Sequence, residues 1–208
     1  MSDTRDSNTY IVRKLADGNC WMVQNLRLVG SKTLTSANSD VTANFTLPAS
    51  ATSGWSAASA HVYNTNNTTY GVLYNWNAAT AGIGSSSTPN SGYIDSSICP
   101  KNWMLPHGDI WNKNFWYLFN NAYKYYVGAG SSNFNSLFSS PFDFTLSGNM
   151  SSDSRWYNSA QAAQYWNNYV DAYGNASYLF LQKSNSGINT AGGGNRYTDG
   201  SAVRCLAR

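Results

Sequence analysis

Residues 17–26 read Asp-Gly-Asn-Cys-Trp-Met-Val-Gln-Asn-Leu, and this stretch decides how the chain begins to fold. Asp17-Gly18-Asn19 indicates a tight turn, because Asp-Gly accepts the positive φ angles that short hairpin turns require. The preceding segment 10–15, Tyr-Ile-Val-Arg-Lys-Leu, has the composition of a short strand, and residues 20–23 supply the returning strand. We therefore expect the chain to open with a β-hairpin.

Long polar loops are expected on either side of one buried segment. Residues 30–70 are rich in Ser, Thr, Asn and Ala and show weak periodicity, so they predict loops with at most short strands. Residues 82–97 form a second loop, rich in Gly, Ser and Pro. Between the two loops, residues 70–76 are apolar enough to be buried.

The clearest helix of the sequence is expected from Ile110 to about Tyr126. Its apolar residues recur at the spacing of one helical face: Ile110, Trp111, Phe115, Leu118, Phe119 and Ala122. Asp109 suits the N-cap or the first turn, and Gly128 and Gly130 are expected to end the helix.

The last third of the sequence favours strands. Segments 142–146, 177–182 and 202–206 each have strand character, whereas Gly192-Gly193-Gly194 predicts a flexible turn. That glycine run lacks the strand–loop–helix context of a phosphate-binding loop. Strands at both ends, one central helix and long loops predict a single α+β domain over residues 1–208, with mixed short strands, one or two helices and neighbouring termini.

The composition argues against nucleic-acid binding and against membrane insertion. Charged side chains make up 11% of the 208 residues, and the net charge of +3 includes no basic run that could follow a phosphate backbone. No stretch of about 18 apolar residues is present that could form a transmembrane helix. Residues 1–6 lack the basic-then-apolar pattern of a signal peptide, so we expect a leader or anchor to lie outside this sequence.

Three cysteines, at positions 20, 99 and 205, fit no zinc-binding pattern, because structural zinc sites need four ligands in close pairs. The simplest interpretation of three cysteines is one disulfide and one free thiol. A Cys99–Cys205 bond would staple the end of the chain to its middle. The alternative is three reduced, buried cysteines in a cytosolic protein.

Four blocks of the sequence resemble, in order, the Fibrobacter succinogenes major paralogous domain family. They are residues 17–26, the Tyr-Asn-Trp of 74–76, the Cys-Pro-Lys-Asn-Trp-Met-Leu-Pro of 99–106, and 196–205. Asn102 stands where the family usually has Gly. The resemblance implies a C-type-lectin-like fold, related to the formylglycine-generating-enzyme branch, and an extracellular or cell-surface location on bacteria. It implies no particular ligand.

One departure from the family suggests a sharper function. Where the family commonly has Tyr-Trp-Ser-Ser-Thr, residues 165–171 read Tyr-Trp-Asn-Asn-Tyr-Val-Asp, and residues 150–157 have a similar composition. Lectin-fold domains of this kind serve as the variable proteins of diversity-generating retroelements, in which adenine-directed mutation randomises Asn-type codons. The resemblance thus implies a variable, ligand-binding half at about 105–200. The alternative to diversification is that this family is rich in loops and in Asn for other reasons.

Two segments supply the candidate ligand-binding residues, with one further residue expected on the rim. They are Asp153, Arg155, Trp156 and Tyr157; Asn167, Asn168, Tyr169, Asp171 and Tyr173; and Arg196. Tyr and Trp offer large contact areas at low entropic cost, while Asn adapts its hydrogen bonds. We expect Trp156 to be exposed and Trp166 to lie in the core.

Catalytic and metal-binding residues are not evident. His61 and His107 are the only histidines, and His107 with Asp109 more readily forms a turn and helix cap than an acid–base pair. Cys99 is interpreted as a disulfide partner, and no close cysteine pair could bind copper. The aspartates are scattered and lack the spacing of a calcium loop. Lectin-fold calcium sites use ligands that are distant in sequence, so this spacing does not exclude a bound calcium ion. We predict no enzyme activity and no cofactor.

The first hypothesis is therefore a surface-display domain that recognises protein or cell-surface targets through a variable site. The alternative is an invariant carbohydrate-binding or structural surface domain of the same fold. An enzyme would need a buried cluster of titratable groups, for which the sequence gives no sign. The oligomeric state is not predicted.

Overall fold

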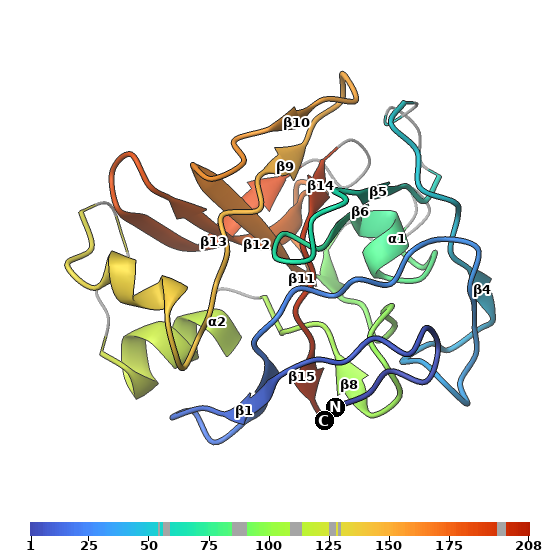
Figure 1. The fold of residues 1–208 in the computed structure, drawn as a ribbon, viewed down its shortest axis with the longest axis horizontal. Helices are drawn as coiled ribbons and strands as arrows, with labels where there is room; N and C mark the ends of the chain where they lie inside the picture. Colours follow the sequence, from blue (N-terminus) through green and yellow to red (C-terminus); the bar gives the residue numbers. More distant parts are fainter. Residues whose placement is uncertain are drawn as a thin grey trace.

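The computed structural model describes residues 1–53, 55, 59–84, 91–108, 114–124, 128, 130–194 and 199–208. These residues form three larger antiparallel sheets and one two-stranded ribbon, with short helical segments packed around them (Figure 1). The architecture is α+β and dominated by small sheets.

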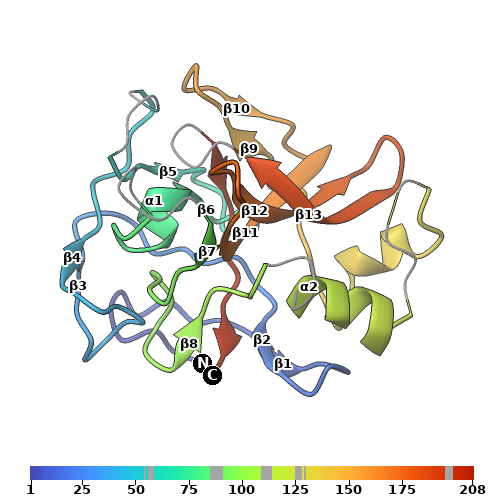
Figure 2. The same cartoon turned by 180° about the vertical axis from the view of Figure 1, so that it is seen from behind.

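The first sheet joins the two ends of the chain. Its strand order is β1-β2-β15-β8, with bounds β1 Val12–Lys14, β2 Cys20–Met22, β15 Leu206–Ala207 and β8 Trp103–Met104. The predicted hairpin is confirmed: Lys14 pairs with Cys20, and Gly18 has a φ of 83° in the turn. The two termini lie side by side next to this sheet (Figures 1 and 2), as expected.

A disulfide holds this sheet to the middle of the chain. Cys99 and Cys205 are both fully buried and bonded to each other across 106 positions of sequence. Cys20 is a free, half-buried thiol. One disulfide with one free thiol is thus present, rather than three reduced cysteines.

The second sheet has the order β10-β9-β14-β6-β5 and contains the predicted buried segment. Its bounds are β10 Trp156–Tyr157, β9 Asn149–Met150, β14 Gly200–Ser201, β6 Val72–Asn75 and β5 Val62–Asn64. All of β6 is buried and runs directly into the short helix α1, Trp76–Ala79. The Asn75 side chain caps that helix by accepting a hydrogen bond from the Ala78 backbone N–H at 2.9 Å.

The third sheet, β13-β12-β11-β7, provides the central wall of the molecule. Its bounds are β13 Gly187–Gly194, β12 Ala176–Gln182, β11 Ala162–Val170 and β7 Gly92–Tyr93. Neighbouring residues of a strand point to opposite faces. Tyr165 and Trp166 therefore enter two different hydrophobic clusters, and each is fully buried. The prediction that Trp166 lies in the core is therefore confirmed.

The predicted long loop before β6 contains only short strands, as expected. The two-stranded ribbon pairs β3, Thr33–Leu34, with β4, Phe45–Thr46. Part of the second predicted loop, residues 85–90, lies outside the described residues.

The predicted helix of residues 110–126 is shorter than expected at its C-terminal end. The structure describes α2, Asn114–Trp116, continued by the π-helix η1, Tyr117–Ala122, while residues 109–113 and 125–127 lie outside the described residues. Lys124 adopts a φ of 57°, which ends the helix before Gly128. The Tyr123 ring packs against Phe142 with centroids 4.6 Å apart, so tertiary packing sets this end. A further 3-10 helix, η2, spans Phe134–Phe138 and was not predicted.

Residues 142–146 do not form the predicted strand. The Phe142 and Asp143 carbonyls accept hydrogen bonds from the Arg204 guanidinium, and Asp143 has a φ of 48°. The Thr145 backbone N–H donates to the Tyr165 hydroxyl at 3.1 Å. Local turns to Leu137 and Ser139, together with these two side chains, have replaced a neighbouring strand as the partners of this backbone.

The predicted final strand at 202–206 is also corrected: of these residues, only Leu206 belongs to β15. The chain leaves the second sheet after β14, crosses the core and enters the first sheet only at β15. In the crossing, the Val203 and Cys205 carbonyls accept hydrogen bonds from Leu26 and Met22. The strand character of 202–206 reflects continuous burial along this crossing and not one continuous ladder.

The glycine run at 192–194 forms the end of strand β13, which corrects the prediction of a flexible turn. Gly192 pairs with Tyr178 of β12. A Cβ atom at Gly192 would lie 2.2 Å from Cε2 of Tyr178, so the missing side chain makes room for the tyrosine ring.

Candidate functional site

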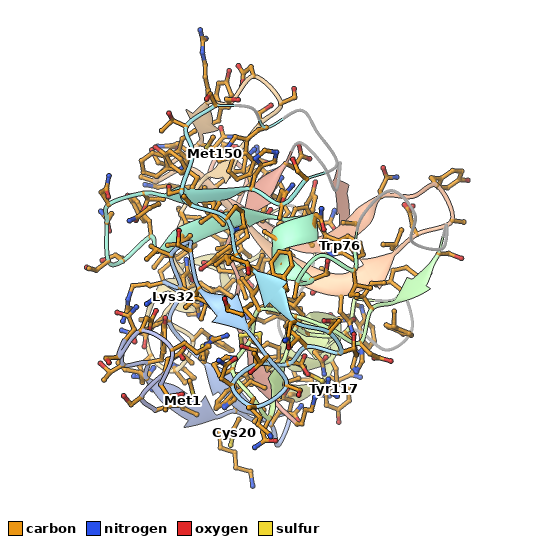
Figure 3. The ribbon with its side chains drawn as sticks, turned by 90° about the vertical axis from the view of Figure 1, so that its right-hand side faces the viewer. Met1, Cys20, Lys32, Trp76, Tyr117 and Met150 are labelled. Atoms are coloured by element: carbon orange, nitrogen blue, oxygen red, sulfur yellow. A yellow bond between two sulfur atoms is a disulfide. The ribbon has the colours of Figure 1, made fainter. Side chains whose placement is uncertain are left out.

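The candidate contact residues fall into two groups near opposite ends of β11. Gly148, which leads into β9, forms a bridge with Ala163 near the start of β11. Asp171 directly follows Val170, the last residue of β11. A strand rises about 3.3 Å per residue, so eight residues separate these points by roughly 25 Å. Figure 3 shows Met150 of β9, next to the first group, near the top of the molecule. The two groups therefore do not form one continuous face.

The first group lies on the β9–β10 hairpin and satisfies its own polar atoms. The Asp153 carboxylate accepts a hydrogen bond from the Tyr157 hydroxyl and another from the Arg155 backbone N–H. The Tyr157 hydrogen bond lowers the pKa of Asp153, and the same bond raises the pKa of Tyr157. All three side chains are exposed, so they form a small polar surface with its charges already paired.

Trp156 is half-buried, which corrects the expectation that it is exposed. Its indole N–H donates to the Ser147 carbonyl at 2.8 Å. Its ring lies 6.0 Å from that of Tyr63 and 5.7 Å from that of Tyr70. Trp156 therefore anchors the hairpin to the second sheet, because a buried indole needs both packing and an acceptor.

Asn167 and Asn168 are buried in β11, at 0% and 4% exposure, and are not accessible to a ligand. Asn167 donates to the Ser177 hydroxyl at 3.2 Å, and the Asn168 side-chain amide donates to the Ile94 carbonyl at 3.3 Å. Their sequence composition suggested a contact surface. The structure instead uses these amides to hold neighbouring segments against a strand that is covered on both faces.

The second group gathers around the end of β11 where it meets the edge strand β7. The Tyr93 ring lies 5.4 Å from that of Tyr169 and 5.1 Å from that of His107. Tyr93 is 41% exposed, and the His107 Nδ1 atom lies 3.2 Å from the amide nitrogen of Asn168. Aromatic rings from three separate segments thus meet at the surface.

A rigid turn extends this cluster. The Asp171 carboxylate accepts hydrogen bonds from the Tyr173 and Asn175 backbone N–H groups at 2.9 and 2.8 Å, and a third from the Asn175 side chain. Gly174 adopts a φ of 81° that closes the turn. Tyr173 is left 92% exposed. We call Tyr93, His107, Tyr169, Asp171 and Tyr173 the tyrosine face.

Sequence reasoning missed two members of this face and placed one further residue that the structure does not describe. Tyr93 lies in a two-residue strand, too short to show periodicity, and His107 was interpreted as part of a turn. Both join the face through tertiary packing, which local sequence does not reveal. Arg196 lies outside the described residues.

No metal-binding cluster or membrane span is found in the described part of the chain. No group of three or more His, Cys, Asp or Glu side chains comes together there. Within the same ranges, every helix is too short or too polar to cross a membrane.

In comparisons with known proteins, no family model, no curated protein and no solved structure matches this chain.

Proposed function

We propose that this chain is a ligand-binding display domain at the cell surface, and that the tyrosine face contacts its ligand. The observation that carries the proposal is the presentation of Tyr173, which a turn held by three hydrogen bonds to Asp171 leaves almost fully in solvent. Because the backbone of the turn is already held, less conformational entropy is lost when the exposed ring binds. Recognition requires no chemistry on the ligand.

The proposed fold is C-type-lectin-like. Three features support it: the termini lie side by side, the first and last strands share a sheet, and a disulfide joins Cys99 to Cys205. The four sequence blocks that resemble the Fibrobacter succinogenes major paralogous domain supply parts of this framework.

The proposed ligand is a protein or another cell-surface target, and the proposed source of variation is a diversity-generating retroelement. Tyr169, Asp171 and Tyr173 are residue types that mutation of Asn-type codons yields, and they lie on or next to the accessible surface. Asn167 and Asn168 could arise from the same codons but are buried. This contrast makes a positional prediction that composition alone does not make.

Sequencing of this gene across a natural population, together with its flanking region, tests the proposal. We expect substitutions at Tyr169, Asp171 and Tyr173, next to a reverse transcriptase gene and a near-identical template repeat. Asn167 and Asn168 are the matched controls: they can arise from the same codons, but they are buried, so selection for folding should keep them constant. An invariant tyrosine face would reject diversification and leave the alternative of a fixed carbohydrate-binding or structural domain, for which a glycan-binding screen is the next experiment.

A further inference from the structure

A groove that shares no residue with the tyrosine face lies between the N-terminal chain, the β5–β6 loop and the chain that leads toward β9. Two adjoining hollows of about 740 and 320 Å³ share Asn8, Arg27 and Thr68 in their walls. Figure 1 shows the bordering segments: the blue N-terminal chain, the teal loop between β5 and β6, and the yellow chain that leads toward β9. Together the hollows form one elongated, open site.

The walls of this groove combine neutral polar side chains with apolar ones. Amides and hydroxyls come from Asn8, Gln24, Asn66, Asn67, Thr68 and Thr69. Each such group can both donate and accept hydrogen bonds, which matches the hydroxyls of a sugar. The half-buried ring of Phe138 adds an apolar patch on which the C–H face of a sugar can rest. Both hollows are open to solvent rather than enclosed.

Arg27 is the fixed cation of the groove. Its guanidinium lies 4.7 Å from the centre of the Tyr10 ring and donates to the Thr9 carbonyl at 2.7 Å. The Tyr10 hydroxyl in turn accepts a hydrogen bond from the Arg27 backbone N–H at 2.9 Å. Among the described residues, no carboxylate lies within ion-pair distance of Arg27. The cation is held in place and remains ready for an external anion.

The other charged groups near Arg27 are buried or already have polar partners. Asp143 lines the groove but is paired with Arg13. Arg204 lies behind Phe144, with its guanidinium carbon 4.2 Å from the ring centre. The Asp6 carboxylate accepts two hydrogen bonds from Asn8, which lines the groove. Arg27 is thus the cation of the groove wall, whereas Arg204 is buried and Arg13 is paired with Asp143.

We propose that this groove binds an acidic polysaccharide, with a sugar carboxylate at Arg27 and neighbouring sugar hydroxyls on the amides and hydroxyls of the walls. This site is separate from the tyrosine face and shares no residue with it. A surface domain with both sites could attach to a cell-wall or matrix glycan while its tyrosine face engages another target.

Isothermal titration calorimetry with tetragalacturonate at low salt tests the proposal. We expect the protein to bind this probe and to bind its fully methyl-esterified form at least about tenfold more weakly, because a charged hydrogen bond is lost. Arg27→Gln should weaken tetragalacturonate binding by a similar factor. Thr68→Val, which removes a hydroxyl without changing shape, should weaken it by a smaller factor.

Lys183→Gln is the matched control, because it removes one positive charge from an exposed position on the turn between β12 and β13. It should bind like the unmodified protein. Thermal unfolding of each variant separates lost binding from lost folding. Absence of tetragalacturonate binding, equal binding of the methyl ester, or preference for a tetrapeptide with a free carboxylate would each overturn the proposal. A failure here leaves the sequencing test of the tyrosine face unaffected.

Discussion

Arg204 lies at 2% exposure beneath the rings of Phe144 and Tyr165, with no carboxylate in ion-pair distance among the described residues. Its guanidinium donates to the Asn25 side-chain oxygen at 3.0 Å and to the Phe142 and Asp143 carbonyls at 2.6 and 2.5 Å. Burial lowers the pKa of Arg204, because removal from water penalises the charged form. Carbonyl dipoles and aromatic faces offset that penalty and tie the C-terminal crossing to residues 142–146.

At this scale, we expect Arg204→Met to lower the free energy of unfolding by about 3 to 5 kcal/mol, because three buried oxygens lose their donor. Arg208→Met is the control. Arg208 forms an ion pair with Asp40 at 2.6 Å but is 47% exposed, so its loss should cost no more than about 1 kcal/mol. Urea denaturation of both variants measures the difference, and similar small losses would show that Arg204 is not a structural tie.

At the scale of the element, strand β13 shows how packing between strands overrides local preference. Its Gly192-Gly193-Gly194 run has poor strand propensity. The Tyr178 ring on the neighbouring strand lies over Gly192 and contacts Trp166, with centroids 5.9 Å apart. The aromatic side chain fills the space that a residue larger than glycine would need.

Adjacent glycines should therefore respond in opposite ways to the same substitution. Gly192→Val should destabilise the protein by about 1 to 3 kcal/mol through overpacking against Tyr178. Gly193→Val should be neutral or stabilising, because the nearest atom to its Cβ is that of Asn175 at an ordinary 3.4 Å. Thermal unfolding of the two variants decides the point, and a stabilising effect of Gly192→Val would contradict this account of the strand.

At the scale of the whole molecule, the Cys99–Cys205 bond and the first sheet close the chain on itself. The last strand, β15, lies between β2 and β8, so strands from both ends and the middle of the sequence share one sheet. The disulfide joins residues 106 positions apart beside that sheet. Much of its stabilisation should come from restricting the unfolded chain, since a longer closed loop loses more entropy.

Replacing both bonded cysteines by serine should lower the free energy of unfolding by about 3 to 5 kcal/mol, as expected for so long a loop. The comparison is made in a Cys20→Ser background, so that the free thiol cannot form a different disulfide. Cys20→Ser alone should change stability by less than about 1 kcal/mol, because that side chain is half-buried and unbonded. A small loss on removal of Cys99–Cys205 would mean that noncovalent packing alone fixes the closure.

The candidate site was only partly predictable. Local composition pointed to Tyr169, Asp171 and Tyr173, and these lie together at one end of β11. The same composition pointed to Asn167 and Asn168, and there the prediction was wrong. Exposure depends on what covers a strand and not on the strand's own residues. Composition also placed the β9–β10 hairpin on the same surface as Tyr169 and Asp171, but the hairpin lies near the other end of β11.

The sequence by itself determined the features that depend on neighbouring residues: the opening hairpin around Asp17-Gly18, the buried segment at 70–76 and the strand at 177–182. Tertiary structure alone decided the crossing at 203–205, the strand at Gly192 and the meeting of Tyr93, His107 and Tyr169. The physical reason is the range of the interactions. Turn geometry and side-chain alternation act within a few residues. Strand pairing, burial and the satisfaction of backbone groups depend on partners far away in the chain.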